Sequence, residues 1–248
     1  MKKHKIGYYS IIMLAFLAIL GMFFLSPIIQ NEDYHNFSDT HTILNIPNFW
    51  NVVSNIPFLI VGILGLLKLN SITTHKIQYF IFFLGVSLVS IGSSYYHLKP
   101  TSNTLVWDRL PMTIAFMALF SIIISEFIHP EIGQKVLIPA LIIGGVSVLY
   151  WVVFKDLRFY ALAQFYPLFA IPIILIFYKS KYNLTAGYWL LLLAYVIAKI
   201  LEQFDAEIHH FLTIISGHSL KHIAAAIGIF ILLNTYLKRK DISISTKK

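Results

Sequence analysis

Eight long apolar segments, separated by short polar stretches, limit most strongly what this chain can fold into. Each segment is close to the roughly 20 residues that an α-helix needs to cross a bilayer. Lipid offers backbone groups no water to bond, so each crossing must satisfy its own hydrogen bonds. The sequence therefore predicts an all-α fold, a polytopic membrane helical bundle. We expect helices at about residues 9–29, 49–67, 78–97, 108–128, 136–154, 160–178, 186–201 and 218–237.

The composition agrees with a membrane protein and excludes several kinds of site. Hydrophobic residues make up 58% of the 248 residues and charged residues 12%, against about a quarter in soluble proteins. Cys is absent, which excludes disulfides and thiolate metal sites, so any metal must bind His, Asp or Glu. The net charge of +8 does not indicate nucleic-acid binding, because the basic residues form no stripe.

The first apolar segment is expected to be an additional helix. It follows the basic start MKKHK, is longer than the apolar part of a signal peptide, and precedes no cleavage-like site. We therefore divide the chain into an N-terminal transmembrane helix, 1–29, and a seven-transmembrane domain, 30–248.

Basic residues predict the orientation. With eight crossings, the loops opposite the termini hold six of the 19 Lys and Arg residues, namely Lys99, Arg109, Lys155, Arg158, Lys199 and Lys221. The remaining thirteen lie on the side of the termini. The positive-inside rule then puts both termini in the cytoplasm.

Polar residues at the ends of three apolar segments predict a functional site. Ser93 and His97 are four residues apart, as are His218 and His222, so each pair shares a helix face. Asp108 opens the next segment after His97, and the predicted topology puts all five at one depth, toward the outer face. Ionisable groups inside a membrane are costly without a partner.

Three imidazoles, two of them at i, i+4 on one helix, suit a catalytic zinc with one open position. Water at that position has its pKa lowered to about 7. Asp108 is the candidate proton carrier, and Ser93 is the candidate hydrogen-bond donor to an oxyanion. A polar network without metal is the alternative.

Other polar residues receive structural interpretations. Arg109 is interpreted as an interfacial anchor, and Asn51, Ser54 and Asn55 as interhelical hydrogen-bonding residues. Three acidic residues on the outer side are candidates for supporting positions only, namely Asp156, Glu202 and Asp205. The remaining histidines are interpreted as loop or interfacial residues: His4, His35, His41, His75, His129, His209 and His210.

Four motifs together resemble the alkaline ceramidase family of membrane hydrolases. They are NFWNVVSN from Asn48, GSSYYH from Gly92, WDRLPM from Trp107 and HSLKH from His218. The resemblance covers about 33–237 and implies zinc on His97, His218 and His222. It also implies that Ser93 and Asp108 are catalytic and that the substrate is the amide of a ceramide-like lipid.

The resemblance also raises the question of calcium. Members of the family from eukaryotes carry an acidic calcium-binding segment before the first core helix, and here Glu32, Asp33, Asn36 and Asp39 are the candidate ligands. The glutamate expected before Phe-Trp-Asn is Asn48. The short, cysteine-free chain is typical of a bacterial member, so the substrate is either ceramide or another N-acyl lipid.

Two classes of function stay open. One is a zinc amidase acting on an N-acyl lipid within the bilayer. The other is a non-enzymatic receptor-like or structural membrane protein, related to the adipoQ-type receptors and hemolysin III proteins, which share the Ser/His/Asp and HxxxH pattern. Ser93 and Asp108 favour the enzyme, because a structural zinc site is closed and needs neither.

Overall fold

A computed structural model describes residues 2–72 and 76–242, so His75, Lys247 and Lys248 lie outside the described residues. Within these ranges the chain is an all-α bundle, and eight helical stretches are long and apolar enough to cross a membrane. Each overlaps one of the eight expected segments, so the predicted fold class is confirmed. The protein is a multi-pass integral membrane protein.

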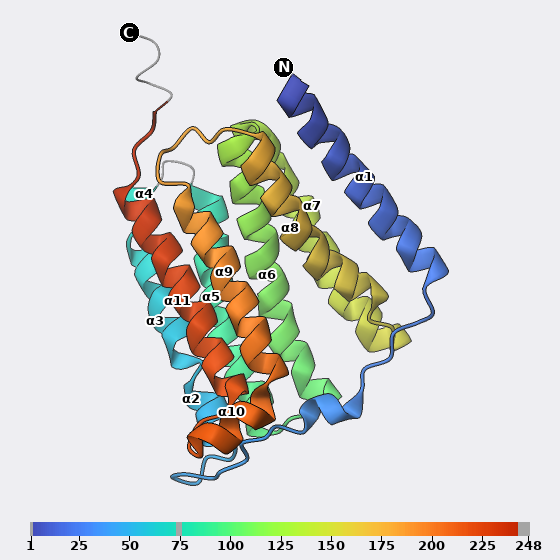
Figure 1. Ribbon diagram of the computed structural model, residues 1–248, viewed down its shortest axis with the longest axis vertical. Helices are drawn as coiled ribbons and strands as arrows, with labels where there is room; N and C mark the ends of the chain where they lie inside the picture. The colour runs from blue at the N-terminus through green and yellow to red at the C-terminus, as the bar shows by residue number, and fades with distance from the viewer. Residues whose placement is uncertain (1, 73–75, 243–248) are drawn as a thin grey trace.

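The spans run in chain order through the bundle (Figure 1). They are α1 (Lys2–Phe24), α2 (Phe49–Val53) with α3 (Ile56–Leu67), α5 (Lys76–Leu98), α6 (Ser102–Phe127), α7 (Pro130–Phe154), α8 (Arg158–Phe177), α9 (Ala186–Gln203) and α11 (Gly217–Lys238). Three short helices lie between them, η1 (Glu32–His35), α4 (Leu69–Ile72) and α10 (Asp205–Leu212).

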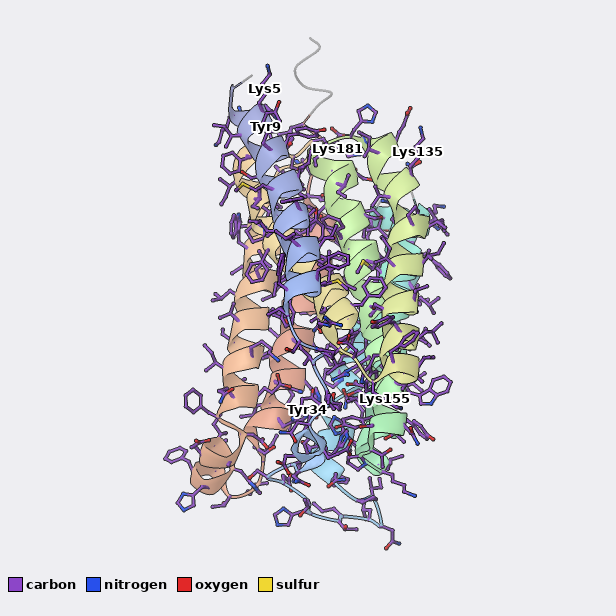
Figure 2. The ribbon with its side chains drawn as sticks, turned by 90° about the vertical axis from the view of Figure 1, so that its right-hand side faces the viewer. Lys5, Tyr9, Tyr34, Lys135, Lys155 and Lys181 are labelled. Atoms are coloured by element: carbon purple, nitrogen blue, oxygen red, sulfur yellow. The ribbon has the colours of Figure 1, made fainter. Side chains whose placement is uncertain are left out.

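Helix α6 is central and α1 is peripheral. The apolar window of α6 is 78% buried, whereas that of α1 is 6% buried. Figure 1 shows α1 at the edge of the bundle, and its partner there is α8. The start of α1 and the end of α11 lie at one end of the molecule, while η1, α2 and α10 lie at the other. Figure 2 shows the same arrangement, with Lys5, Lys135 and Lys181 at one end and Tyr34 toward the other.

The first helix ends earlier than expected, at Phe24 instead of residue 29. Arg158 explains the early end, because its Nη1 donates to the carbonyl oxygens of Met22 (2.8 Å) and Leu25 (2.6 Å). These are orphan carbonyls of the last turn, which need a partner when a helix stops. The chain then leaves the helix, and the Ile28 amide donates to Asp156 Oδ1 at 3.2 Å.

The second expected helix is broken between α2 and α3. Two serines of α5 bond the backbone at the break. The Ser94 hydroxyl donates to the Val52 carbonyl oxygen (3.2 Å), and the Ser90 hydroxyl donates to the Asn55 carbonyl oxygen (2.7 Å). The expected span at 49–67 is confirmed in its bounds, and the structure adds a break between α2 and α3 within it.

Two further boundaries differ from expectation. Helix α6 begins at Ser102 instead of Asp108, because Thr101 and Thr104 form a reciprocal capping box ahead of the apolar stretch. Helix α10 was not expected, since its sequence DAEIHHFL is too polar for the apolar pattern that defined the segments. The start of α6 and helix α10 both lie at the end of the molecule that carries the candidate site.

Candidate metal centre

Three buried histidines meet at one end of the bundle. His97 comes from the last turn of α5, and His218 and His222 come from the first two turns of α11. Their ring centroids lie 5.0 to 5.2 Å apart, and one nitrogen of each lies within 4.8 Å of the others. The structure thus brings together the three residues that the i, i+4 pattern selected. We call them the histidine triad.

The triad has nitrogen atoms that need a partner. His97 Nδ1 and His218 Nε2 are buried and have no hydrogen-bond partner among the residues that the structure describes. The Ser54 hydroxyl lies 2.8 Å from His222 Nδ1, which leaves Nε2 of that ring as its free nitrogen. A buried polar atom without a partner costs about 1–3 kcal/mol. Three imidazoles with free nitrogens at this spacing fit a zinc ion.

Neighbouring side chains fix the start of α11. The Ser216 hydroxyl accepts from the Ser219 amide, and Asp205 Oδ1 accepts from the His218 amide at 2.6 Å. The Ser219 hydroxyl donates to Asn51 Oδ1 at 2.7 Å, which ties α11 to α2. The first turn of α11, which carries His218 and leads to His222, is therefore held from both sides. The interhelical interpretation of Asn51 and Ser54 is confirmed.

Ser93 and Asp108 lie across the α5–α6 contact. The Ser93 side chain lies close enough to the Asp108 carboxylate to act as a hydrogen-bond donor to it. Ser93 is 2% exposed, and Asp108 is half-buried. Gly92 permits the close approach, because a Cβ there would lie 1.9 Å from the Trp107 carbonyl oxygen. The chain therefore needs glycine at the point where its two candidate catalytic residues meet.

Phe37 covers the triad from the segment between η1 and α2. Its ring centroid lies 4.7 Å from that of His97 and 4.4 Å from that of His218. Asn48 reaches the same region in a left-handed conformation (φ 48°), and its Nδ2 donates to the His97 carbonyl oxygen at 2.8 Å. Asn tolerates this conformation better than most residues. Both residues reduce the access of water to His97.

Arg109 contacts aromatic rings and Gln30 instead of the histidine triad. Its guanidinium carbon lies 4.3 Å from the Trp151 ring, 4.8 Å from Tyr160 and 5.9 Å from Tyr34, and its Nη2 donates to Gln30 Oε1 at 2.7 Å. At 8% exposed, it is a buried cation held by aromatic faces. The interpretation as an interfacial anchor was therefore wrong.

The three acidic residues considered for supporting positions have structural partners. Asp205 Oδ2 also accepts from the Ser38 amide at 3.0 Å. Glu202 pairs with Lys199 and, at 2.5 Å, with Lys221. Asp156 pairs with Arg158, whose guanidinium holds the pKa of that carboxyl at about 2.

The candidate calcium residues separate into two places. Asp33 and Asn36 belong to η1 and its C-cap, where Asn36 Nδ2 donates to Asp33 Oδ1 at 3.3 Å. Asp39 is fully buried and lies with His41 and His209. Calcium binding by Asp33, Asn36 and Asp39 stays a prediction.

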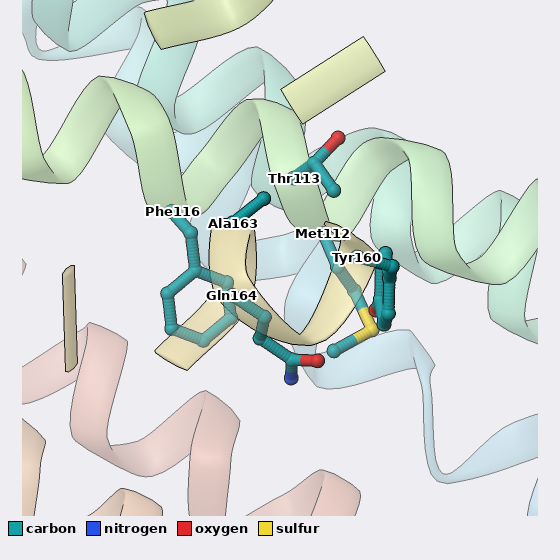
Figure 3. A pocket seen from close by; sticks show the side chains of 6 residues that line it. All are labelled: Met112, Thr113, Phe116, Tyr160, Ala163 and Gln164. Atoms are coloured by element: carbon teal, nitrogen blue, oxygen red, sulfur yellow. The ribbon is translucent and has the colours of Figure 1, made fainter. Parts of the chain in front are cut away.

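An apolar groove of about 640 Å³ opens between α8 and α9. Its lining includes Phe169, Trp189 and Val196 and extends along α9 to Lys199 and Gln203. By contrast, Figure 3 shows Met112 and Phe116 of α6 close to Tyr160 and Gln164 of α8, where the gap is too small for water. The groove thus lies on the α8–α9 side, and Lys199 in its lining pairs with Glu202, which also pairs with Lys221 on α11.

Sequence reasoning found the triad but missed contacts between distant segments. It named Ser54 without its link to His222, and it treated His35 as an interfacial residue. The His35 ring in fact lies between Tyr96 OH (2.8 Å) and Ser102 Oγ (3.1 Å). Burial lowers the pKa of His35, in agreement with a neutral ring that joins η1 to α5 and α6.

A family model described as Ceramidase matches residues 35–243. No curated protein matches the chain. The matched range leaves out α1 and begins within η1, so it contains the histidine triad, Ser93, Asp108 and the groove.

Proposed function

Because the chain belongs to the ceramidase family of amide-bond hydrolases, we propose that it cleaves ceramide or a related N-acyl lipid with a zinc ion held by His97, His218 and His222. The observation that carries the proposal is the pair of buried, unpartnered nitrogens, His97 Nδ1 and His218 Nε2, within a triad of imidazoles. An ion at the triad would give both nitrogens a partner.

Zinc bound there would polarise the amide carbonyl and make a water molecule acidic enough to attack near neutral pH. Asp108 and Ser93 carry out the proton transfer and the hydrogen bonding. Asp108 is the group that takes a proton from the attacking water and passes it to the leaving nitrogen. Ser93 orients the Asp108 carboxylate through their hydrogen bond and donates to the developing oxyanion when the bond is released.

Two features exclude bulk water from the reaction. Phe37 packs on the rings of His97 and His218, and Asn48 occupies the His97 carbonyl oxygen. In such an environment electrostatic interactions are stronger than in water, which benefits an oxyanion and its donors. Phe37 and Asn48 both contact His97, so their proposed role is to hold His97 in position.

The groove between α8 and α9 supports a lipid substrate. It is lined by Leu168, Phe169, Leu192, Leu193 and other apolar residues, and it has the volume of a typical ligand site. An acyl chain lying in the groove can remain in a hydrocarbon environment while its amide approaches α11. A soluble peptide would gain no such contact.

We further propose that the termini are cytoplasmic and that the triad faces the outer side. The excess of Lys and Arg at the end of the molecule that carries the start of α1 and the end of α11 supports this orientation. The division into an added helix, 1–29, and a catalytic domain, 30–248, is supported by the peripheral place of α1.

Two substitutions at the reacting centre test the enzyme proposal. Asp108→Asn keeps the shape of the side chain and removes its capacity to carry the proton, so turnover of an N-acyl lipid should fall by about 10²-fold or more. Ser93→Ala should also lower turnover. Metal content should stay the same in both variants, because neither residue is a ligand in the proposal.

Wild-type turnover in both variants, with the metal retained, would contradict the enzyme proposal. That result would favour the non-enzymatic receptor-like alternative, in which the metal only stabilises the bundle. The Thr113→Ala variant serves as a control, because Thr113 is a buried residue of α6 whose hydroxyl bonds the Leu110 carbonyl of its own helix.

A further inference from the structure

A second group of potential ligands lies at the same end of the molecule, outside the triad. Asp39 and His41 come from the segment between η1 and α2, and His209 comes from α10. One ligand atom of each lies within 4.8 Å of the others. Tertiary structure brings His209 to Asp39 and His41, which precede it by about 170 residues in the chain.

Asp39 carries an unsatisfied atom at this place. Its side chain is fully buried, and its Oδ2 has no hydrogen-bond partner within 2–72 and 76–242. Its Oδ1 accepts from the His41 amide (3.0 Å) and lies 2.7 Å from His41 Nδ1. A carboxylate without access to water needs a nearby compensating charge. The His41 side chain is 60% exposed, so it compensates the Asp39 charge only weakly.

The neighbouring residues orient His209 toward Asp39 and His41. The Ser38 hydroxyl lies 2.9 Å from His209 Nδ1, so the ring's other nitrogen is free. The rings of His41 and His209 lie edge to face, with centroids 5.8 Å apart. A metal-binding histidine almost always has its second nitrogen held in this way.

We propose that Asp39, His41 and His209 form a second metal site, which binds a divalent ion of the zinc class. Two imidazoles and one carboxylate are ligands of that class, whereas calcium prefers oxygen ligands throughout. Ligand atoms around a tetrahedral zinc lie about 3.4 Å apart, given bonds of about 2.0–2.1 Å. Asp39 Oδ1 and His41 Nδ1 lie 2.7 Å apart as a bonded pair, so the exposed side chain of His41 must rotate for both atoms to bind the ion.

The second site is joined to the triad by hydrogen bonds. Ser38, which orients His209, donates its amide to Asp205, and Asp205 in turn accepts from the His218 amide. On the other side, the Asp39 carbonyl oxygen accepts from Asn51, which accepts from Ser219. An ion at the second site therefore fixes the segment that places Phe37 over the triad.

Zinc stoichiometry of the purified full-length protein tests the proposal. The wild type and a His41→Ala, His209→Ala double variant are equilibrated with Zn²⁺ and then analysed for bound metal. The double variant should hold one zinc per chain fewer than the wild type. It should also gain less thermal stability from added Zn²⁺. His210→Ala is the matched control, because it removes an exposed histidine from the same helix.

Equal zinc content in the wild type and the double variant would overturn the proposal, as would full displacement of the second zinc by Ca²⁺ at equal concentration. The result is independent of the histidine triad. If the triad binds no zinc, the content should fall from one ion to none, which supports the second site while the proposed function fails. Retention of the fold is expected, because His41 and His209 are not core residues.

Discussion

At the scale of single residues, the hydroxyl of Ser54 determines which nitrogen of His222 is free. Ser54→Ala removes that hydrogen bond and lets the ring turn, so zinc affinity should fall by about 10- to 100-fold. Competition with a chelator of known affinity measures the change. Ser147→Ala is the control, because Ser147 is equally buried and bonds only the Gly144 carbonyl of its own helix. Equal zinc affinity in the two variants would remove Ser54 from the site.

No residue with a side chain can replace Gly92 without a clash between α5 and α6. In Gly92→Ala, the added Cβ would meet the Trp107 carbonyl oxygen at 1.9 Å, so α5 and α6 must separate. We expect a loss of stability of about 1–3 kcal/mol and a loss of turnover as Ser93 moves from Asp108. Gly145→Ala, where the added Cβ meets no described atom within 4 Å apart from the backbone around it in α7, should be neutral or slightly stabilising. Thermal unfolding in detergent measures both; equal unfolding temperatures would contradict the close contact.

Local spacing was sufficient to find residues on one helix face, and insufficient to find partners across the fold. The i, i+4 pattern selected His97, His218 and His222 because spacing on a helix fixes their direction. The pattern gave no sign that His41 and His209 would meet, since their proximity depends on how α10 folds back. A polar helix of eight residues leaves too little apolar periodicity to predict that turn.

At the scale of elements, α1 is fixed to the core by Asp156 and Arg158. Asp156→Asn weakens the salt bridge and should release the end of α1. A short bifunctional thiol reagent that joins His4→Cys to Tyr178→Cys, whose native rings lie 5.1 Å apart at the α1–α8 contact, reports docking in a chain that has no other cysteine. The cross-linking yield should fall in the Asp156→Asn background; an unchanged yield would mean that apolar packing alone holds α1.

The same pair predicts a pH response. Arg158 lowers the pKa of Asp156 from 3.8 to about 2, so its stabilising contribution is complete above about pH 4 and is lost as the pH falls through about 2. The difference in unfolding temperature between the wild type and Asp156→Asn should therefore stay constant from pH 5 to 8. A difference that shrinks within this range would contradict the assignment of the pKa.

The apolar pattern predicted every spanning helix, because length and hydropathy decide what crosses a bilayer. It could not predict the break between α2 and α3, since the partners of Val52 and Asn55 are serines of α5. It also placed the end of α1 too late, because the residue that ends the helix, Arg158, lies far along the chain. Helix ends set by tertiary contacts are not readable from local sequence.

At the scale of the whole molecule, the orientation in the membrane can be measured directly. Thr42 lies between η1 and α2, Lys240 lies just after the end of α11, and both residues are exposed. Figure 1 shows η1 and α2 at the opposite end of the bundle from the end of α11. In intact cells an impermeant thiol reagent should label Thr42→Cys and leave Lys240→Cys unlabelled until the cells are opened. The reverse pattern would overturn the outward-facing site.

The proposed role of the histidine triad is tested most directly by removing and restoring its metal. The purified protein is stripped with a chelator, and fatty-acid release from a ceramide in lipid vesicles is followed before and after Zn²⁺ is returned. We expect release to be lost with the metal and recovered with about one zinc per chain at the triad. The His218→Ala, His222→Ala variant should not recover. Undiminished release from the stripped protein, or from that variant, would contradict a zinc-dependent amidase.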